Sequence, residues 1–386
     1  MDFNFTEEQE AVAQAAASVF LGMVTPARVA EIERTDDRFD GVLWAALARS
    51  NLLGLAVAEE QGGSGLGLTE VCLVLEQQGR AVAPIPLWAT AVLGAMPLSR
   101  FGSPEQKSRW LPGVVAGDVR LSAALTEAAA STSERPAVSA TRQAGGFTLS
   151  GTTRNVPQAH LADRVLVPAH TDDGVVVALV DPTGPGATLE RVTTTDRQIH
   201  PHLHLDGAVV DEADVLAGPS NGAGVVTWML DRARTGLCAL QLGVTEEAIR
   251  RAAAYLNERQ QFGRPLSSFQ GTMLRAADAY IDSEAIRVTL WQAAWRLDTG
   301  RPATDAVAVA KWWASEAGQR VVHATQHLHG GMGADVEYPI HRYFLWGKQI
   351  ELMLEGPSAQ LARMGTALAA RYRQPGPAPA ASGGGR

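Results

Sequence analysis

Apolar residues in the last part of the chain recur at spacings of three and four, which is the period of an amphipathic helix. One run of this kind ends at Arg259 and contains Leu237, Leu240, Val244, Ala248, Ile249, Ala253 and Leu256. The same pattern predicts helices over residues 224–259, 268–297, 303–329 and 338–372, the last interrupted near Gly356 and Pro357. Four long amphipathic helices indicate a bundle.

The first third of the chain also has a helical pattern. Thr6 followed by Gln9 is typical of a capping box, and Ser103 followed by Gln106 repeats it with proline at the first helical position. Residues 42–53 and 68–82 add two further apolar stripes between these starts. We therefore predict an all-helical domain over residues 1–118.

Between the two helical parts the pattern changes to short runs of β-type residues separated by turns. Gly145 and Gly146 join one such pair of runs, and residues 172–174 (DDG) join the next. The predicted fold class is therefore α+β and mainly α, with a helical domain at 1–118, an antiparallel β domain at 119–218 and a four-helix bundle at 219–373. Residues 374–386 are rich in Pro, Gly, Ala and Ser and are predicted to be a disordered tail.

Composition narrows the function classes. The formal net charge of −8 argues against a general nucleic-acid binder, because phosphate backbones demand a basic surface. The two cysteines, Cys72 and Cys238, each lie in an apolar helical pattern and are expected to be buried thiols rather than a disulfide or a metal site. The start MDFNFTEEQE lacks signal-peptide features, and no apolar run reaches about 18 residues, so we expect a cytoplasmic protein without a membrane span.

Two further motifs have a possible chemical reading beside a structural one. Residues 63–67 (GSGLG) resemble a dinucleotide-binding loop, but no clear strand precedes them, so a turn between helices is the favoured interpretation. His200, His202 and His204 alternate on one predicted strand face and could hold a metal, although solvated or loosely packed histidines fit better because no further ligand motif accompanies them.

A second histidine set lies in the third bundle helix. His323 and His327 are spaced i and i+4, with His329 close by, but no glutamate follows His323 as a metalloprotease motif requires. We therefore predict no metal site.

The stretch 258–270 (ERQQFGRPLSSFQ) places a cation at a helix end. Arg259 ends the amphipathic run, and Gly263 and Pro265 are expected to stop the helix. A guanidinium there suits phosphate oxygens, but it would also simply neutralise the helix dipole. The stretch alone leaves both interpretations open.

This stretch resembles a signature of the acyl-CoA dehydrogenase superfamily, R-x-Q-F-G-x-P-L-x-x-F-Q, and matches it at every fixed position. The resemblance extends over nearly the whole length. It implies an FAD-dependent oxidoreductase in which Arg259, Phe262 and Gln270 contact the flavin of a neighbouring protomer. In the family's Gln-x-x-Gly-Gly segment this chain has His327, Gly330 and Gly331, which are assigned the same role.

For the catalytic base, the resemblance points to Glu355 in LMLEGPSAQ, near the family's Glu-Gly-Thr loop. Pro357 replaces the threonine, and Glu355 comes one residue later than in typical members, so an ordinary glutamate at a helix start is the alternative. Some relatives carry the base on the first bundle helix instead, but the matching residue here is Ala233. Arg234 matches the arginine that lies beside the active-site carboxylate in relatives.

The β domain matches the family's flavin-binding motifs only in part. Thr126 keeps the threonine of the Thr-Glu-Pro motif, and Thr132 keeps a hydroxyl where the family has serine. Relatives also carry an aromatic residue followed by Ile-Thr or Ile-Ser near the flavin ring. Residues 155–157 (NVP) offer neither the aromatic nor the hydroxyl.

Three functional hypotheses follow. The first is an acyl-CoA dehydrogenase of lipid metabolism that uses Glu355 and FAD to form a 2-enoyl-CoA and passes electrons to an acceptor such as an electron-transfer flavoprotein. The second is a largely non-catalytic subunit of a heteromeric member of the actinobacterial type, so that the assembly is a homotetramer or a heterotetramer. The third is a related flavoenzyme acting on a substrate that is not a thioester.

Overall fold

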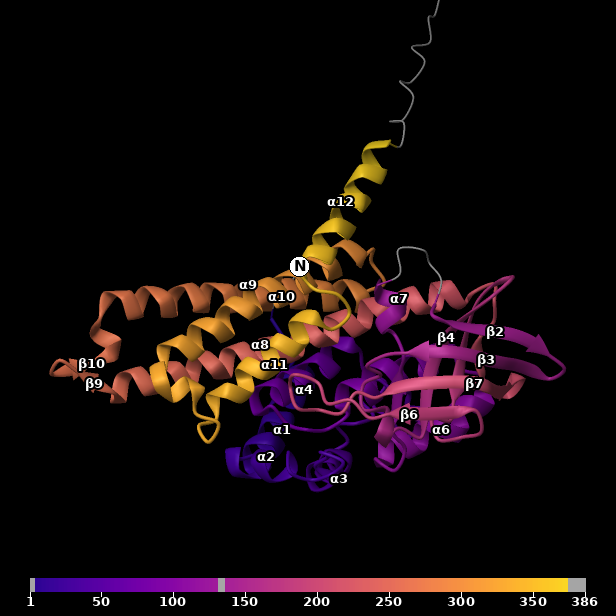
Figure 1. Ribbon diagram of the computed structural model, residues 1–386, viewed down its shortest axis with the longest axis horizontal. Coiled ribbons are helices and arrows are strands. Elements are labelled where there is room, and N and C mark those ends of the chain that lie inside the picture. The colour runs from indigo at the N-terminus through magenta and orange to yellow at the C-terminus, as the bar shows by residue number, and fades with distance from the viewer. Residues whose placement is uncertain (1–3, 131–135, 374–386) are drawn as a thin grey trace, which may run out of the picture.

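The computed structural model describes residues 4–130 and 136–373. In Figure 1 the long helices of the C-terminal part run side by side, the β-sheet lies at one end of them, and the N-terminal helices lie beneath. The predicted fold class is confirmed: the chain is mainly helical and has a central sheet. Thr132 and the predicted disordered tail, 374–386, lie outside the described residues.

Six α-helices form the N-terminal part. They are α1 (Glu7–Met23), α2 (Pro26–Ile32), α3 (Gly41–Arg49), α4 (Leu68–Ala81), α5 (Met96–Phe101) and α6 (Pro104–Ala116). Both predicted capping boxes are confirmed, at the starts of α1 and α6. The glycine-rich stretch 63–67 is a turn before α4, in which Gly65 has φ +66° and its amide donates to the carbonyl of Val57. The interpretation as a turn is thereby confirmed.

The central sheet has eight strands. They are β1 (Leu121–Ala123), β2 (Val138–Gln143), β3 (Gly146–Thr153), β4 (Arg164–Thr171), β5 (Gly174–Val180), β6 (Ala187–Glu190), β7 (His202–Asp211) and β8 (Val215–Ala217). The order is β6-β7-β3-β2-β4-β5-β8, with β1 beside β4. Most pairs are antiparallel, as predicted for this domain, but β1 and β2 both pair with β4 in parallel. Residue alternation defines the faces of a strand but not the direction of its partner.

The C-terminal part consists of α8 (Gly222–Glu258), α9 (Gln270–Asp298), α10 (Thr304–Leu328), α11 (Ile340–Leu352) and α12 (Pro357–Arg373). The predicted interruption near Gly356 is confirmed. It is more than a kink, because α12 leaves the bundle and projects away from the body of the molecule (Figure 1). The fourth helix of the bundle is therefore α11 alone.

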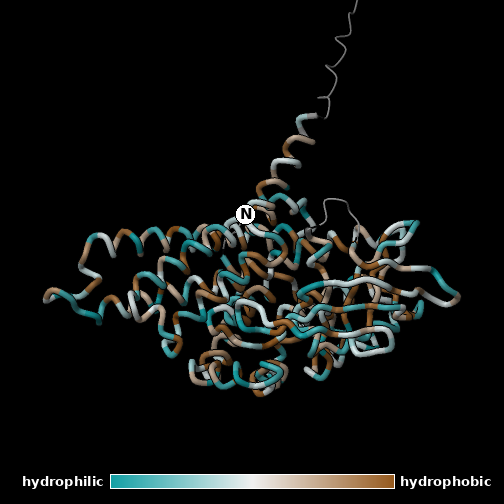
Figure 2. Tube along the Cα trace, viewed as in Figure 1, coloured by the Kyte–Doolittle hydropathy of each residue, from teal (hydrophilic) through white to brown (hydrophobic). Residues whose placement is uncertain are grey.

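Close contact between α4 and α8 joins the N-terminal helices to the bundle. A Cβ atom on Gly79 would lie 2.1 Å from the carbonyl oxygen of Leu240, and one on Gly243 would lie 1.9 Å from that of Glu76. Only glycine permits this approach, so both positions are required by packing. Hydrophobic residues recur along all of these helices (Figure 2). Many of them belong to one buried cluster that includes residues of the N-terminal helices and of the bundle.

The predicted buried thiols are confirmed, since Cys72 in α4 and Cys238 in α8 are both free and buried. No single helix in the described residues is long and apolar enough to cross a membrane. The pair α1 and α2 passes on length and composition only when taken together, and the two helices meet at a 75° bend.

Candidate active site

Glu355 lies in the short loop between α11 and α12. Both Leu354 and Glu355 have left-handed backbone conformations, with φ of 51° and 78°. Such conformations are uncommon for residues other than glycine and are found most often where the surrounding structure fixes a functional side chain. Leu354 is buried in the bundle core, and this anchors the loop and directs Glu355 toward α8.

Two guanidinium groups surround the Glu355 carboxylate. Its Oε2 lies 3.5 Å from Nη2 of Arg234 in α8, so the predicted neighbourhood of these two residues is present. The same oxygen accepts a hydrogen bond of 2.6 Å from Nε of Arg363 in α12 and lies 2.5 Å from its Nη2. Arg363 also donates to the backbone carbonyl of Ala129 at the edge of the β domain. Sequence reasoning missed Arg363.

Arg234 is held in an unusually dry environment. Its side chain is 6% exposed, and its Nε and Nη2 have no hydrogen-bond partner within the described part of the chain. Burial, together with repulsion from Arg363, lowers the pKa of Arg234 to about 10. Nearby, burial raises the pKa of Asp231, whose carboxylate accepts a hydrogen bond of 3.2 Å from Thr304. Buried and unpartnered donors of this kind are typical of a site that receives a polar ligand group.

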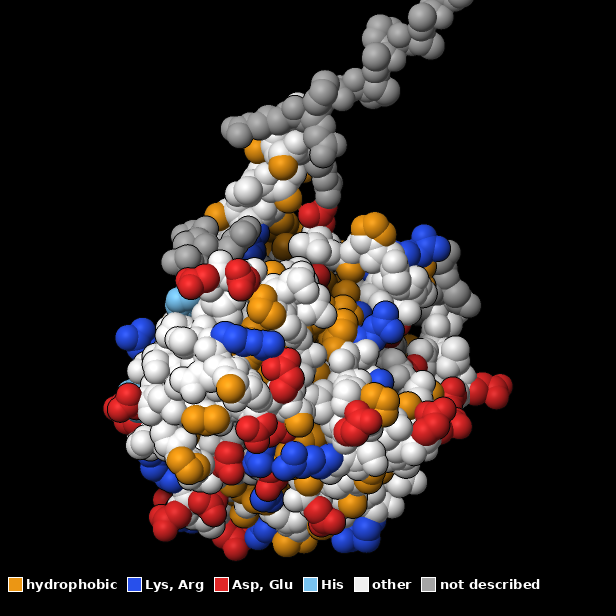
Figure 3. Space-filling view, turned by 90° about the vertical axis from the view of Figure 1, so that its right-hand side faces the viewer, with side chains coloured by type: hydrophobic (Ala, Val, Ile, Leu, Met, Phe, Trp, Pro, Cys, Tyr) orange, Lys and Arg blue, Asp and Glu red, His pale blue; other side chains and the backbone are white. Residues whose placement is uncertain are grey.

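Glu355, Arg234 and Arg363 line a cleft of about 940 Å³ between the bundle, α12 and the sheet. The walls are otherwise mainly apolar, with Val175 from β5, Leu230 from α8 and Val307 from α10. In Figure 3 hydrophobic side chains line a hollow below the base of α12, the helix that projects from the molecule. A long apolar cleft with a few convergent charged groups suits a ligand with an apolar chain and one polar, reactive end.

Thr126, the one predicted flavin contact of the β domain that lies in the described residues, belongs to a helix that reaches this cleft. Thr126 is the first residue of α7 (Thr126–Ala130), and Ala128 of the same helix lines the cleft. The adjacent Glu127 accepts hydrogen bonds of 2.7 Å from the Thr153 hydroxyl and 2.8 Å from the Arg154 amide. Glu127 therefore fixes α7 to the end of β3.

The segment 155–157, where relatives carry an aromatic residue and a hydroxyl, has a structural role in this chain. Val156 is fully buried, and the carbonyl of Pro157 accepts a hydrogen bond of 2.6 Å from Ser122. The amide of Asn155 donates to Nδ1 of His202, 3.1 Å away. This segment ties β1 to β7.

The other predicted flavin contacts lie at the far end of the bundle. Arg259, Phe262, Gln270, His327, Gly330 and Gly331 are all exposed. Arg259 is the first residue after α8, one residue beyond its expected place in the helix, and its amide donates to the Tyr255 carbonyl. The glycine turn that follows joins two short strands, β9 (Gln260–Gln261) and β10 (Arg264–Pro265). Figure 1 shows this hairpin at one tip of the molecule and α7 in the other half, beside the sheet. One chain therefore does not bring the two groups together.

Three histidines of the two sets contact other protein groups. His204 contacts Thr152 and Glu190, at 3.0 Å each, and His202 accepts the amide of Asn155. His329 lies stacked on Tyr255 and contacts the Thr325 carbonyl. Across residues 4–130 and 136–373 no group of three or more His, Cys, Asp or Glu side chains is arranged to hold a metal ion.

The sequence of this chain is similar to those of known proteins of one family. Residues 6–118 match the family model of the acyl-CoA dehydrogenase N-terminal domain, and residues 220–367 match that of the C-terminal domain. Acyl-CoA dehydrogenase FadE27 of Mycobacterium tuberculosis is 39% identical over 377 residues, covering 96% of this chain and 99% of the relative. This chain belongs to the acyl-CoA dehydrogenase family. It is accordingly a flavoprotein oxidoreductase whose cofactor is FAD.

Two solved structures are similar over almost the whole chain. The ChsE4–ChsE5 complex of Mycobacterium tuberculosis has a TM-score of 0.90 at 40% identity, covering 96% of this chain and 99% of the other. A variant of the Tcur3481–Tcur3483 steroid ACAD has a TM-score of 0.89 at 45% identity, covering 95% and 99%. The first of these structures is a complex, and the name of the second joins two components.

The residues of the chain fit FAD as two half-sites. At the bundle end, Gly330 has φ +58°, and a Cβ atom on Gly330 or Gly331 would meet nothing within 4 Å, so a ligand can approach this backbone closely. The exposed Arg259 nearby is suited to a phosphate. At the cleft end, Thr126 lies in α7, the helix whose Ala128 lines the cleft. When bound, FAD supplies the hydride acceptor.

Proposed function

We propose that this chain catalyses the α,β-dehydrogenation of an acyl-CoA thioester to a 2-enoyl-CoA. In this proposal the carboxylate of Glu355 removes the α-proton, the β-hydride goes to bound FAD, and Arg234 and Arg363 position the carboxylate. One observation carries the proposal: a carboxylate, fixed by an uncommon backbone conformation and two guanidinium groups, faces a largely apolar cleft of about 940 Å³.

The ion pairs leave one oxygen of the base for proton transfer. Arg234 and Arg363 both contact Oε2 of Glu355, so Oε1 is assigned to accept the α-proton. The two cations compensate the negative charge of the base in the resting site, and the apolar walls exclude water from the reacting carbon. The buried Nε of Arg234 has no hydrogen-bond partner in the described residues, and we assign it to the substrate's polar end.

The test is the substitution Glu355→Gln, compared with Glu60→Gln on the exposed surface of the N-terminal part. The amide keeps the shape of the side chain but cannot take a proton. We expect normal FAD content and a fall of at least about 100-fold in the rate at which acyl-CoA bleaches the flavin absorbance. Glu60→Gln should match the unmodified protein. Unchanged bleaching in Glu355→Gln would rule out this base.

A second proposal concerns assembly and substrate class. Residues 155–157 have no aromatic residue or hydroxyl for the flavin ring, and Val156 is fully buried. The similar ChsE4–ChsE5 structure is a complex, and the Tcur3481–Tcur3483 protein is described as a steroid ACAD. We propose that this chain assembles with a related subunit, acts on a steroid-type acyl-CoA and delivers its electrons to an electron-transfer flavoprotein.

The visible spectrum tests this second proposal. The chain purified alone should be nearly colourless and should gain FAD when co-expressed with its related subunit. The co-expressed protein should be bleached faster by a steroid acyl-CoA than by octanoyl-CoA. A yellow homo-oligomer with stoichiometric FAD would exclude the heteromer and leave the dehydrogenase proposal intact.

A further inference from the structure

A second cavity, of about 620 Å³, is separate from the active-site cleft. It is lined by α1, α2, the end of α4, the C-terminal third of α8 and the start of α11, so it lies where the N-terminal helices meet the bundle. The cavity and the cleft share no lining residue. The catalytic proposal therefore gives this cavity no role.

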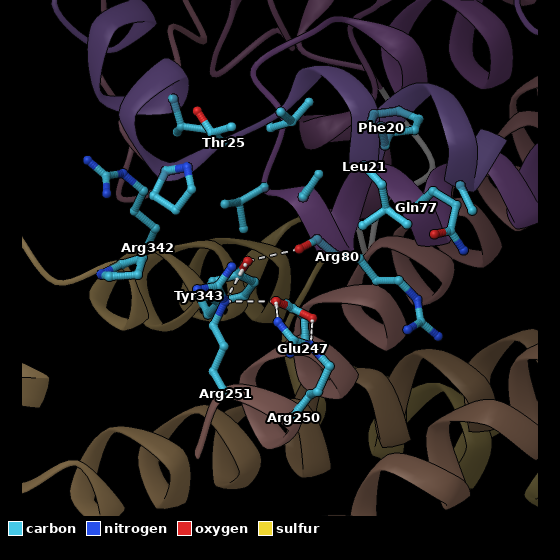
Figure 4. Close-up of a pocket in the computed structure, with 17 residues that line it drawn as sticks. Phe20, Leu21, Thr25, Gln77, Arg80, Glu247, Arg250, Arg251, Arg342 and Tyr343 are labelled. Carbon is cyan, nitrogen blue, oxygen red and sulfur yellow. Dashed lines mark hydrogen bonds and ion pairs between the residues drawn. The ribbon is translucent and has the colours of Figure 1, made fainter. Parts of the chain in front are cut away.

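The two sides of the cavity differ in chemistry. In Figure 4 Phe20 and Leu21 lie on the side of the N-terminal helices, with Arg250 and Arg251 on the facing side. Further apolar side chains extend the first wall, namely Ala17, Val24, Val29, Ala81 and Val82. The cationic wall is completed by Arg342 and Arg80 at its two ends.

Four arginines line the cavity, and of the carboxylates that pair with them only Glu247 lines it too. Arg80 pairs with Glu76 and Glu246, neither of which lines the cavity. Glu247 already accepts hydrogen bonds from Nε and Nη2 of Arg250, at 2.6 Å each, and lies 2.8 Å from Nε of Arg251. Glu33, which holds Arg342 through Nε at 3.0 Å and Nη2 at 2.9 Å, does not line the cavity. An anion entering here meets guanidinium groups before it meets any free carboxylate.

Hydrogen bonds hold the cationic wall in place. Arg251 donates from Nε to the hydroxyl of Tyr343, 3.2 Å away, and that hydroxyl donates to the carbonyl of Arg80 at 2.9 Å. Burial raises the pKa of Tyr343 to about 12, so its hydroxyl stays protonated and keeps both bonds. Arg342 is only 7% exposed and has little freedom to move. A preordered set of forked donors binds an anion at a lower entropic cost than flexible surface side chains do.

We propose that this cavity binds an amphipathic carboxylate, whose hydrocarbon part packs on α1 and α2 while its carboxylate lies between Arg251 and Arg342. The volume lies within the range of cavities that enclose one drug-sized ligand. Because the walls belong to both halves of the molecule, the bound ligand links the N-terminal helices to the bundle and stabilises their contact.

The experiment measures the binding of decanoate to the FAD-loaded, fully assembled protein by isothermal titration calorimetry. The substitution Arg251→Gln should weaken binding about tenfold or more, because it removes a charged donor to the carboxylate. Ala17→Trp, which fills the apolar end, should abolish binding. Arg49→Gln, on the exposed surface of α3, should leave it unchanged. Flavin absorbance and melting temperature of each variant establish that it is folded.

Three outcomes would overturn the proposal. Equal affinity for the neutral 1-decanol would mean that the arginines recognise no carboxylate. Loss of decanoate binding in Arg363→Gln, with binding retained in Ala17→Trp, would place the ligand in the active-site cleft. Absence of binding to the assembled protein would mean that no carboxylate occupies the cavity there.

Discussion

Lys311 provides the sharpest test of how the bundle supports the Glu355 loop. Its side chain is fully buried in α10, and Nζ donates to the hydroxyl of Ser315 at 2.7 Å and to the carbonyls of Ile350 and Glu351 at 3.1 and 3.2 Å. These carbonyls belong to the last turn of α11, just before the loop. Lys311→Met retains most of the side-chain volume and removes the donor.

Two opposing contributions to the free energy of unfolding determine how much stability Lys311→Met loses. A buried carbonyl left without its hydrogen-bond donor costs about 1–3 kcal/mol of stability. In Lys311→Met the carbonyls of Ile350 and Glu351 both lose their donor. Against this, the substitution removes a buried charge. Burial lowers the pKa of Lys311 from 10.5 to about 8, which corresponds to about 3 kcal/mol against the charged form at neutral pH. The variant is therefore expected to lose at most about 3 kcal/mol at neutral pH.

The pH dependence of this loss has a definite sign. Above pH 8 the folded protein has released the proton of Lys311, whereas the unfolded chain keeps it up to about pH 10.5. The unfolded state binds more protons in this window, so the free energy of unfolding of the unmodified protein rises with pH relative to that of Lys311→Met. The difference should grow by about 2 kcal/mol between pH 8 and pH 9.5.

Urea unfolding followed by far-ultraviolet circular dichroism, at several pH values, measures both quantities. Lys348→Met is a matched control on α11, because Lys348 is partly exposed and pairs with Glu351 at 2.5 Å. Its loss should stay below about 1 kcal/mol. A stability difference between Lys311→Met and the unmodified protein that does not change from pH 8 to 9.5 would refute the reasoning.

Two further predictions concern packing and the ion pair. Gly243→Ala places a methyl group against the Glu76 carbonyl and should lower the free energy of unfolding in urea by about 3 kcal/mol or more. Gly22→Ala, with nothing within 4 Å of the new methyl group, should not destabilise α1. Equal effects of the two substitutions would contradict the close approach of α4 and α8. Arg363→Gln removes a side chain that is 40% exposed, so stability should fall by less than about 1 kcal/mol while flavin bleaching by substrate slows; unchanged bleaching would exclude Arg363 from positioning the base.

The helices were predictable because their signals are local. The capping boxes at Thr6 and Ser103, and the apolar stripe that ends near Arg259, lie within the segments that they describe. Chain direction within the sheet was not predictable, because the parallel partner of β2 is β4, separated from it by a whole strand. Period-two alternation in each strand is the same for either direction.

For the site, the approach of Arg234 to Glu355 was expected from the family resemblance, whereas Arg363 was missed. The apolar pattern of residues 338–372 reads as one interrupted bundle helix, and it does not show that α12 turns away and brings Arg363 back to the carboxylate. The second cavity was invisible for a similar reason. Arg80, Arg251 and Arg342 come from three helices that are far apart in the chain.

Because the two proposed half-sites for FAD are separate, substitutions in each of them can show which subunit of the assembly binds the flavin that each half-site contacts. Arg259 borders the β9–β10 hairpin and Thr126 begins α7, which lie in different halves of the molecule (Figure 1), so we assign the two residues to different FAD molecules. In a homo-oligomer both half-sites are used, and Arg259→Gln and Thr126→Ala should each lower the FAD content. In a heteromer whose flavin occupies the partner's β domain, only Arg259→Gln should do so, weakening FAD binding about tenfold or more through the loss of a charged contact to phosphate. FAD content measured by absorbance, with Arg142→Gln as the surface control, separates these cases. Full FAD content in both variants would show that neither half-site binds the cofactor.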